Sequence, residues 1–124
     1  MRNLIILSTA TSALMLACGA SHPAPTQQMA DAQAATRSAS ELGAGAEPRA
    51  QLHLKLAEEQ MAQAKSAMEK DDNESAERLL LRAKSDAELA VALMHEHDAK
   101  ETASKADQQS DSQRSTNASQ GATP

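Results

Sequence analysis

Cys18, the single cysteine of the chain, lies where its neighbours indicate a specific chemistry. It follows a short apolar run and small residues, in the stretch Leu14-Met15-Leu16-Ala17-Cys18-Gly19. This pattern is typical of a lipobox, in which the thiol accepts a diacylglycerol group and cleavage makes the cysteine the new N-terminus. We therefore expect Cys18 to be the lipid attachment site of a bacterial lipoprotein that also carries palmitate-type acyl chains.

Residues 1–17 have the features of the matching signal peptide. Arg2 supplies a positive charge, and the apolar run that follows is too short and too rich in hydroxyl groups for a helix that spans a bilayer. An alternative is ordinary secretory cleavage after Ala20, which would remove Cys18. Neither alternative leaves a thiol for a disulfide or for a thiolate metal site.

Gly19 bears on the location of such a lipoprotein. In proteobacterial lipoproteins an aspartate after the cysteine commonly retains the protein in the inner membrane, and here that position is glycine. For a Gram-negative host we therefore expect the periplasmic face of the outer membrane.

The histidines offer little for metal binding. His95 and His97 are two residues apart and would point about 200° away from each other on a helix, whereas shared ligation needs a spacing of three or four. His53 and His22 have no histidine near them in the sequence, and only a loose contact through His95 with Asp98 remains possible. We expect surface histidines, no metal and no cofactor.

The carboxylate pairs Glu58 with Glu59 and Asp86 with Glu88 lie on charged faces that offer no pocket to shift their pKa values. The chain has no glycine-rich phosphate loop and no serine in a nucleophile elbow. It is also acidic, with a net charge of −5, and lacks the clustered Lys and Arg that bind a phosphate backbone. We therefore expect neither an enzyme nor a nucleic-acid-binding protein.

The periodicity of the apolar residues predicts an all-α fold, either a helical hairpin or a three-helix bundle rich in alanine. Two prolines make residues 18–28 a tether, and the helical domain should span 29–105. The predicted helices are 26–42, 48–70 and 73–105, separated by the glycines around Ala44 and by an acidic turn at 71–73. Residues 106–124 lack large apolar side chains and should form a disordered tail.

Alternating steps of four and three predict one apolar face on each helix. On the first helix we expect the face at Ala32, Ala35, Ala39 and Leu42. The second should use Ala50, Leu54, Ala57, Met61, Ala64 and Met68, and the third Ala76, Leu80, Ala83, Ala87, Ala90 and Met94. The last two faces should meet in an antiparallel hairpin, and Asp71 with Glu74 has capping-box spacing at the start of the third helix. The methionines on these faces are core residues rather than metal ligands.

The apolar content is low for a protein that folds as one copy. From Cys18 onward there are nine leucines, one valine, no isoleucine and no aromatic residue. A buried alanine gains on the order of 0.8 kcal/mol, whereas ordering one residue costs about 1 to 2 kcal/mol. We therefore expect self-association or a helical protein partner, through an interaction face formed by Leu54, Met61, Met68, Leu80 and Met94.

The order of these segments resembles the DUF4398 family of envelope lipoproteins, a domain of unknown function. The similarity covers about residues 28–99 and rests on four segments: the glycine loop 42–48, the segment 65–68, the acidic turn 71–76 and the alanine-rich segment 83–90. The resemblance implies the envelope location and the helical fold. It implies no activity.

Two functions fit these expectations. The first is a lipoprotein anchored by Cys18 in the outer membrane, with an interaction or scaffolding role in the periplasm. The alternative is an oligomeric coiled-coil spacer of the cell envelope that resembles the small murein lipoproteins. Covalent attachment to peptidoglycan in those proteins uses a C-terminal lysine, whereas this chain ends at Pro124.

Overall fold

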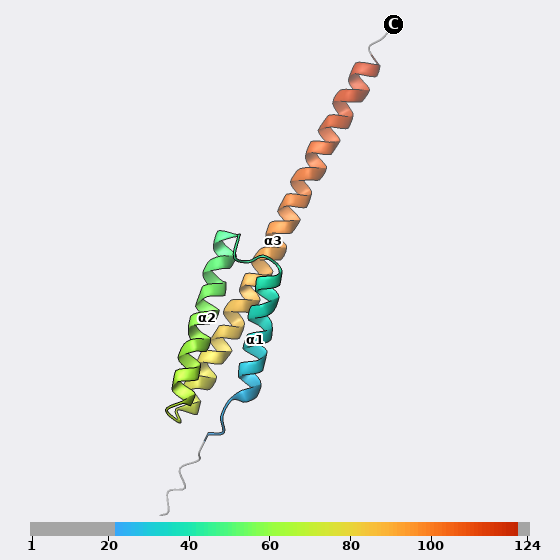
Figure 1. Ribbon diagram of the computed structural model, residues 1–124. Helices are drawn as coiled ribbons and strands as arrows, with labels where there is room; N and C mark the ends of the chain where they lie inside the picture. Colours follow the sequence, from blue (N-terminus) through green and yellow to red (C-terminus); the bar gives the residue numbers. More distant parts are fainter. Residues whose placement is uncertain (1–21, 122–124) are drawn as a thin grey trace, which may run out of the picture.

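The computed structural model describes residues 22–121, which form three α-helices and no strand within that range. The helices are α1 (Thr26–Glu41), α2 (Pro48–Met68) and α3 (Asn73–Gln120). α2 and α3 form an antiparallel hairpin, and α1 packs alongside it, mainly against α3 (Figure 1). This arrangement confirms the predicted all-α bundle and the predicted hairpin.

The end of α1 follows the predicted glycine signal. Gly43 adopts a left-handed φ of 82°, which glycine reaches without steric cost. Its backbone N–H donates to the Ser40 carbonyl at 3.0 Å, and the N–H of Ala44 donates to Ala39 at 3.1 Å. These two bonds form a Schellman motif, which satisfies carbonyls that the end of the helix would leave unpaired.

The turn between α2 and α3 differs in one detail from the prediction. Asp72, not Asp71, caps α3, because its side chain accepts the backbone N–H of Ser75 at 3.1 Å. Asp71 lies instead just beyond the C-terminus of α2 and has a left-handed φ of 58°, while the N–H of Asp72 donates to the Ala67 carbonyl at 3.0 Å. The predicted cap was therefore one residue too early, because the C-terminal motif of α2 already uses Asp71.

Alanine makes up most of the core, and Leu80 is the only large side chain of the described residues that is fully buried. Most of the buried apolar residues in the range 22–121 fall into two clusters. One lies beside the loop that joins α1 to α2 and includes Ala39, Ala50, Leu54, Ala90, Leu93 and Met94. The other lies beside the turn that joins α2 to α3 and includes Ala32, Ala64, Ala76, Leu80 and Ala83.

The predicted apolar faces are largely confirmed. All six predicted residues of α3 are buried, as are Ala50, Leu54, Ala57 and Ala64 of α2. On α1 the buried face is Ala32, Thr36 and Ala39, and Leu42 remains 37% exposed. Thr36 fits because its hydroxyl donates to the Ala32 carbonyl at 2.8 Å, so its polar atom has a partner inside the bundle.

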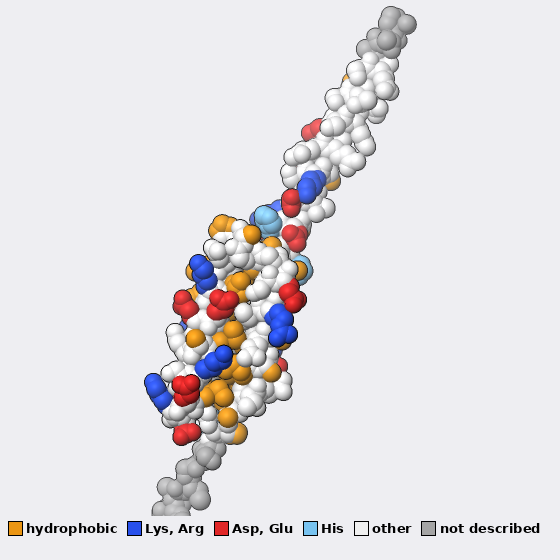
Figure 2. Space-filling view, in the orientation of Figure 1, with side chains coloured by type: hydrophobic (Ala, Val, Ile, Leu, Met, Phe, Trp, Pro, Cys, Tyr) orange, Lys and Arg blue, Asp and Glu red, His pale blue; other side chains and the backbone are white. Residues whose placement is uncertain are grey.

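α3 continues to Gln120, well beyond the predicted end at residue 105, and projects from the bundle as a single helix (Figure 1). The tail expected to be disordered from residue 106 is thus helical over 106–120. No proline or glycine interrupts it before Gly121, and hydroxyls bond back to the preceding turn, as Thr116 does to the Ser112 carbonyl at 2.9 Å. The extension has few charged or apolar side chains in the view of Figure 2.

Candidate functional site

The predicted interaction face lies within the bundle. Leu54, Leu80 and Met94 are buried, and Met61 and Met68 are half-buried and pack against the cluster around Leu80. These residues therefore join the three helices of one chain and do not form an outer surface. Cys18, the predicted lipid attachment site, lies outside the described residues.

A polar contact joins the middle of α2 to α3. The Asp86 carboxylate lies 3.0 Å from Nδ1 of His53 through one oxygen and accepts Nε2 of Gln60 at 2.7 Å through the other. The His53 and Asp86 side chains are only 25% and 22% exposed. Gln60 is buried, and its Oε1 has no hydrogen-bond partner among the described residues.

The sequence did not predict this contact, because it placed His53 alone and Asp86 on a solvated face. Each of the three residues directly precedes a residue of the predicted apolar face, namely Leu54, Met61 and Ala87. That position at the edge of the helix interface is the signal that would have found the contact. The contact fixes how α2 and α3 are aligned, since both oxygens of one carboxylate are used by the opposite helix.

The other histidines do not form a metal site. His95 and His97 are exposed, and residues 22–121 contain no group of three or more histidine, cysteine or carboxylate side chains that could hold an ion. His22 lies 3.3 Å from the Glu77 carboxylate, which also accepts from Gln28. These contacts position the N-terminal segment rather than a ligand.

The start of the described chain is fixed against the turn end of the hairpin. The Asn73 amide donates to the His22 carbonyl at 2.7 Å, and the His22 ring reaches Glu77 on the first turns of α3. Pro25, which precedes α1, is buried. The chain therefore enters the bundle beside the turn, at the end opposite to the projecting part of α3 (Figure 1).

The exposed carboxylates of α3 are paired with basic side chains, most of them on the same helix. The hydrogen bond from Lys100 holds the pKa of Glu96 below its usual value, with further effects from the charges of Lys100 and Arg49. Lys105 likewise lowers the pKa of Glu101. Ion pairs join these two glutamates to Lys100 and Lys105, and a further pair joins Glu74 to Arg78. Glu58 and Glu59 are exposed.

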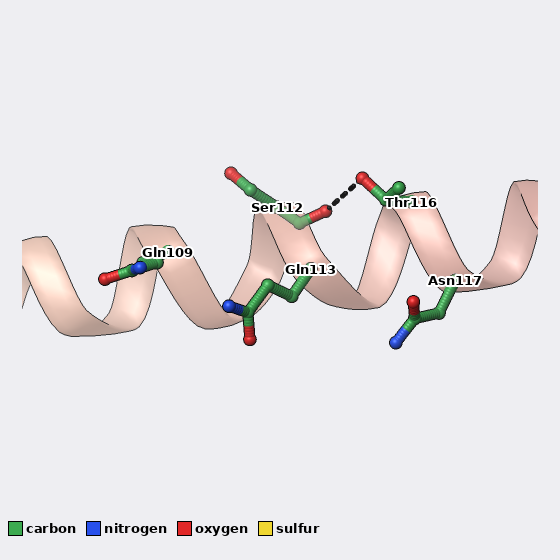
Figure 3. Close-up of a pocket in the computed structure, with 5 residues that line it drawn as sticks. All are labelled: Gln109, Ser112, Gln113, Thr116 and Asn117. Carbon is green, nitrogen blue, oxygen red and sulfur yellow. Dashed lines mark hydrogen bonds between the residues drawn. The ribbon is translucent and has the colours of Figure 1, made fainter.

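Three hollows on the surface of residues 22–121 are open to solvent. One hollow, of 510 Å³, lies along the projecting part of α3 and is lined by Gln109, Ser112, Gln113, Thr116 and Asn117. Figure 3 shows that all five side chains come from one helix, so they form a polar face and not a cavity. A second hollow, of 430 Å³, lies between α1 and α3 beside Ala35 and Val91.

Among the residues that the structure describes, four large apolar side chains are exposed: Leu42, Leu52, Leu81 and Leu89. Leu81 and Leu89 lie on the same side of α3 and line a hollow of 340 Å³ together with Arg82, Ser85 and Asp86.

None of the described helices is long and apolar enough to cross a membrane.

A family model for a domain of unknown function, DUF4398, matches residues 27–110. The chain belongs to the DUF4398 family. The match begins at the first turn of α1 and extends into the projecting part of α3, so the family domain includes the whole three-helix bundle. No curated protein and no solved structure matches the chain.

Proposed function

We propose that this DUF4398 protein is a lipoprotein of the outer membrane that acts in the periplasm as a non-enzymatic scaffold, holding its helical bundle and the projecting part of α3 at a fixed place relative to the membrane. Cys18, in its lipobox sequence, is the proposed anchor. We assign no catalytic residues to this scaffold. Its helices provide the surface for interaction.

The observation that carries the proposal is the position of the N-terminal segment. His22 is held against Asn73 and Glu77 at the turn end of the hairpin. Only three residues separate Cys18 from His22, and these four residue steps span at most about 14 Å when fully extended. An anchor on Cys18 would therefore keep the turn end of the bundle next to the lipid headgroups.

The direction of α3 relative to the N-terminal segment also supports the proposal. α3 starts at the turn end and contains 48 residues, so it is about 72 Å long at a rise of about 1.5 Å per residue. An anchor at the turn end would point the projecting part of α3 away from the membrane (Figure 1). A helix of this length also favours the second candidate function, an oligomeric spacer of the cell envelope.

The test is metabolic labelling of cells with an alkyne-bearing fatty acid, followed by separation of inner and outer membranes. We expect the wild-type protein to carry the label and to sediment with outer membranes, and Cys18→Ser to carry none. Ser21→Ala is the matched control, because it removes a hydroxyl nearby and leaves the thiol. An unlabelled mature protein that begins at Ser21 would disprove the anchor.

A further inference from the structure

Three of the methionines in the described range gather where α1 meets the hairpin. Met29 lies on α1, and Met61 and Met68 lie on α2. All three are half-buried, and all three pack against the buried cluster around Leu80. In Figure 2 hydrophobic side chains gather between α1 and α2 in this half of the bundle. We call Met29, Met61 and Met68 the methionine cluster.

One contact sets the level of the methionine cluster in the bundle. The Thr36 hydroxyl of α1 lies 3.9 Å from the Met61 sulfur of α2. The two helices run in opposite directions on either side of a short loop (Figure 1). Met29 comes seven residues before Thr36, and Met68 comes seven residues after Met61. Both therefore lie about two turns nearer the turn end of the hairpin, in the same part of the interface between α1 and α2.

The attachment of α1 to the hairpin depends on these thioethers. Met29 is the only large apolar side chain of α1, and the residues that α1 buries are Ala32, Thr36 and Ala39. The polar contacts of this end are weak, because Gln28 reaches Glu77 at 3.3 Å through partly exposed groups. Small buried side chains contribute little apolar area, so the methionines of both helices supply much of the contact that holds α1 in place.

Methionine is also the most readily oxidised side chain of the bundle. The chain has no tryptophan, tyrosine or phenylalanine, and its one cysteine is Cys18. Thioethers react rapidly with hypohalous acids, and the product, methionine sulfoxide, is polar where methionine was apolar. The half-buried sulfurs of the methionine cluster are accessible to so small an oxidant. Met94 is only 7% exposed and lies in the cluster beside the loop between α1 and α2, so its packing protects it.

We propose that the methionine cluster is a site of oxidation by hypohalous acids such as hypochlorous acid, and that oxidation releases α1 from the hairpin. In each reaction a methionine sulfur gives two electrons to the chlorine, the Cl–O bond breaks, and one S–O bond forms. The products are a sulfoxide, a chloride ion and a proton. Methionine sulfoxide reductases convert the sulfoxide back to methionine. This inference does not rest on the lipid anchor, because all three methionines lie in the bundle.

At Met61 the added oxygen would lack a hydrogen-bond donor in Thr36. Thr36 is 8% exposed, and its hydroxyl already donates its single proton to the Ala32 carbonyl, 2.8 Å away. An oxygen on the Met61 sulfur would therefore face the lone pairs of that hydroxyl. Burial of an unpaired polar group disfavours the packed state, whereas separation of α1 lets water bond to the sulfoxide. Separation would also uncover the apolar cluster around Leu80.

The first experiment maps oxidation in the full chain. The protein is treated with increasing amounts of hypochlorous acid, and its tryptic peptides are analysed by mass spectrometry. Met61, Met68 and Met94 fall on three separate peptides. We expect each sulfur of the methionine cluster to gain one oxygen at doses that leave Met94 unchanged. Oxidation of Met94 at the same doses would overturn the assignment of the site.

The second experiment measures hydrogen exchange of the backbone amides before and after a dose that oxidises only the methionine cluster. We expect the amides of α1 to exchange at least about tenfold faster after oxidation, because the packed state of α1 is destabilised. The hairpin of α2 and α3 should keep most of its protection, since the contacts between these two helices remain. Unchanged exchange of α1 in the oxidised protein would disprove its release.

A triple variant, Met29→Leu, Met61→Leu and Met68→Leu together, keeps the apolar volume but has no sulfur at these positions. The same treatment should leave its α1 exchange unchanged, whereas Met94→Leu, the matched control, should respond as wild type does. Reduction of the oxidised wild-type protein by methionine sulfoxide reductases should restore slow exchange, which tests the proposal without any substitution. Faster α1 exchange in the treated triple variant, or a wild-type effect that the reductases do not reverse, would assign the opening to another modification and refute the proposal.

Discussion

At the scale of single residues, the contact of Asp86 with His53 and Gln60 is the feature that the sequence did not predict. A histidine, a glutamine and an aspartate on alanine-rich helices have the composition of a solvated surface. Their burial depends on how α2 and α3 are rotated and aligned, and residue types alone do not determine that alignment. The Gln60 side chain is buried and its Oε1 has no hydrogen-bond partner among the described residues, so the burial of this oxygen lowers the stability of the fold.

Asp86 contacts two residues of α2, whereas the Oε1 of Gln60 has no partner among the described residues, and this difference leads to a prediction. Asp86→Ala should lower the free energy of unfolding by about 1 to 3 kcal/mol, because it leaves the buried Gln60 amide and the His53 ring without their acceptor. Gln60→Leu should cost less than Asp86→Ala, because it also removes the unpaired oxygen. Urea unfolding at neutral pH measures both values.

Glu88→Ala serves as the control for the Asp86 variant. Glu88 is also a carboxylate of α3, but its side chain is 61% exposed. Its removal should change the free energy of unfolding by no more than about 0.5 kcal/mol. Equal losses for the Asp86 and Glu88 variants would mean that the contact contributes nothing to stability.

At the scale of the helices, the sequence predicted the number, order and starts of the elements well. Proline at the first position of α2, glycine after α1 and the acidic turn act locally, so their effects follow from the residues themselves. The end of α3 was not predictable in the same way. Residues 106–120 lack the large side chains that would bury against a core, and their helix depends on the absence of a stop signal and on local hydrogen bonds.

The start of α3 supports a prediction about pH. Hydrogen bonds from the Ser75 hydroxyl and backbone N–H hold the pKa of Asp72 below its ordinary value of 3.8. A carboxyl whose pKa is lowered by folding stabilises the fold above its unfolded pKa, and this contribution is lost as pH falls through the lower folded pKa. Asp72→Ala should therefore lower the thermal midpoint at pH 7, and the difference from wild type should shrink below about pH 4.

Asp71→Gly tests whether the effect belongs to the cap. It removes the neighbouring carboxylate and suits the left-handed φ of 58° at that position. We expect its midpoint to be no lower than wild type at any pH. A pH-independent loss for Asp72→Ala, or a loss for Asp71→Gly, would contradict the assignment of Asp72 as the cap.

At the scale of the whole molecule, the chain consists of two parts with different sources of stability. Residues 26–94 form a bundle in which α1 and α2 cover one side of α3. Beyond Met94 every side chain of α3 is exposed. An isolated helix in water is marginal, so this extension depends on its continuity with the bundle.

Ending the chain after Lys105 should therefore separate the two parts. We expect the free energy of unfolding of the bundle to stay within about 0.5 kcal/mol of the full chain, because the deleted residues are exposed. The helical signal in circular dichroism should fall in proportion to the deleted length of α3. Urea unfolding of the truncated and full chains measures this, and a clear loss of stability on truncation would show that the extension supports the bundle within one chain.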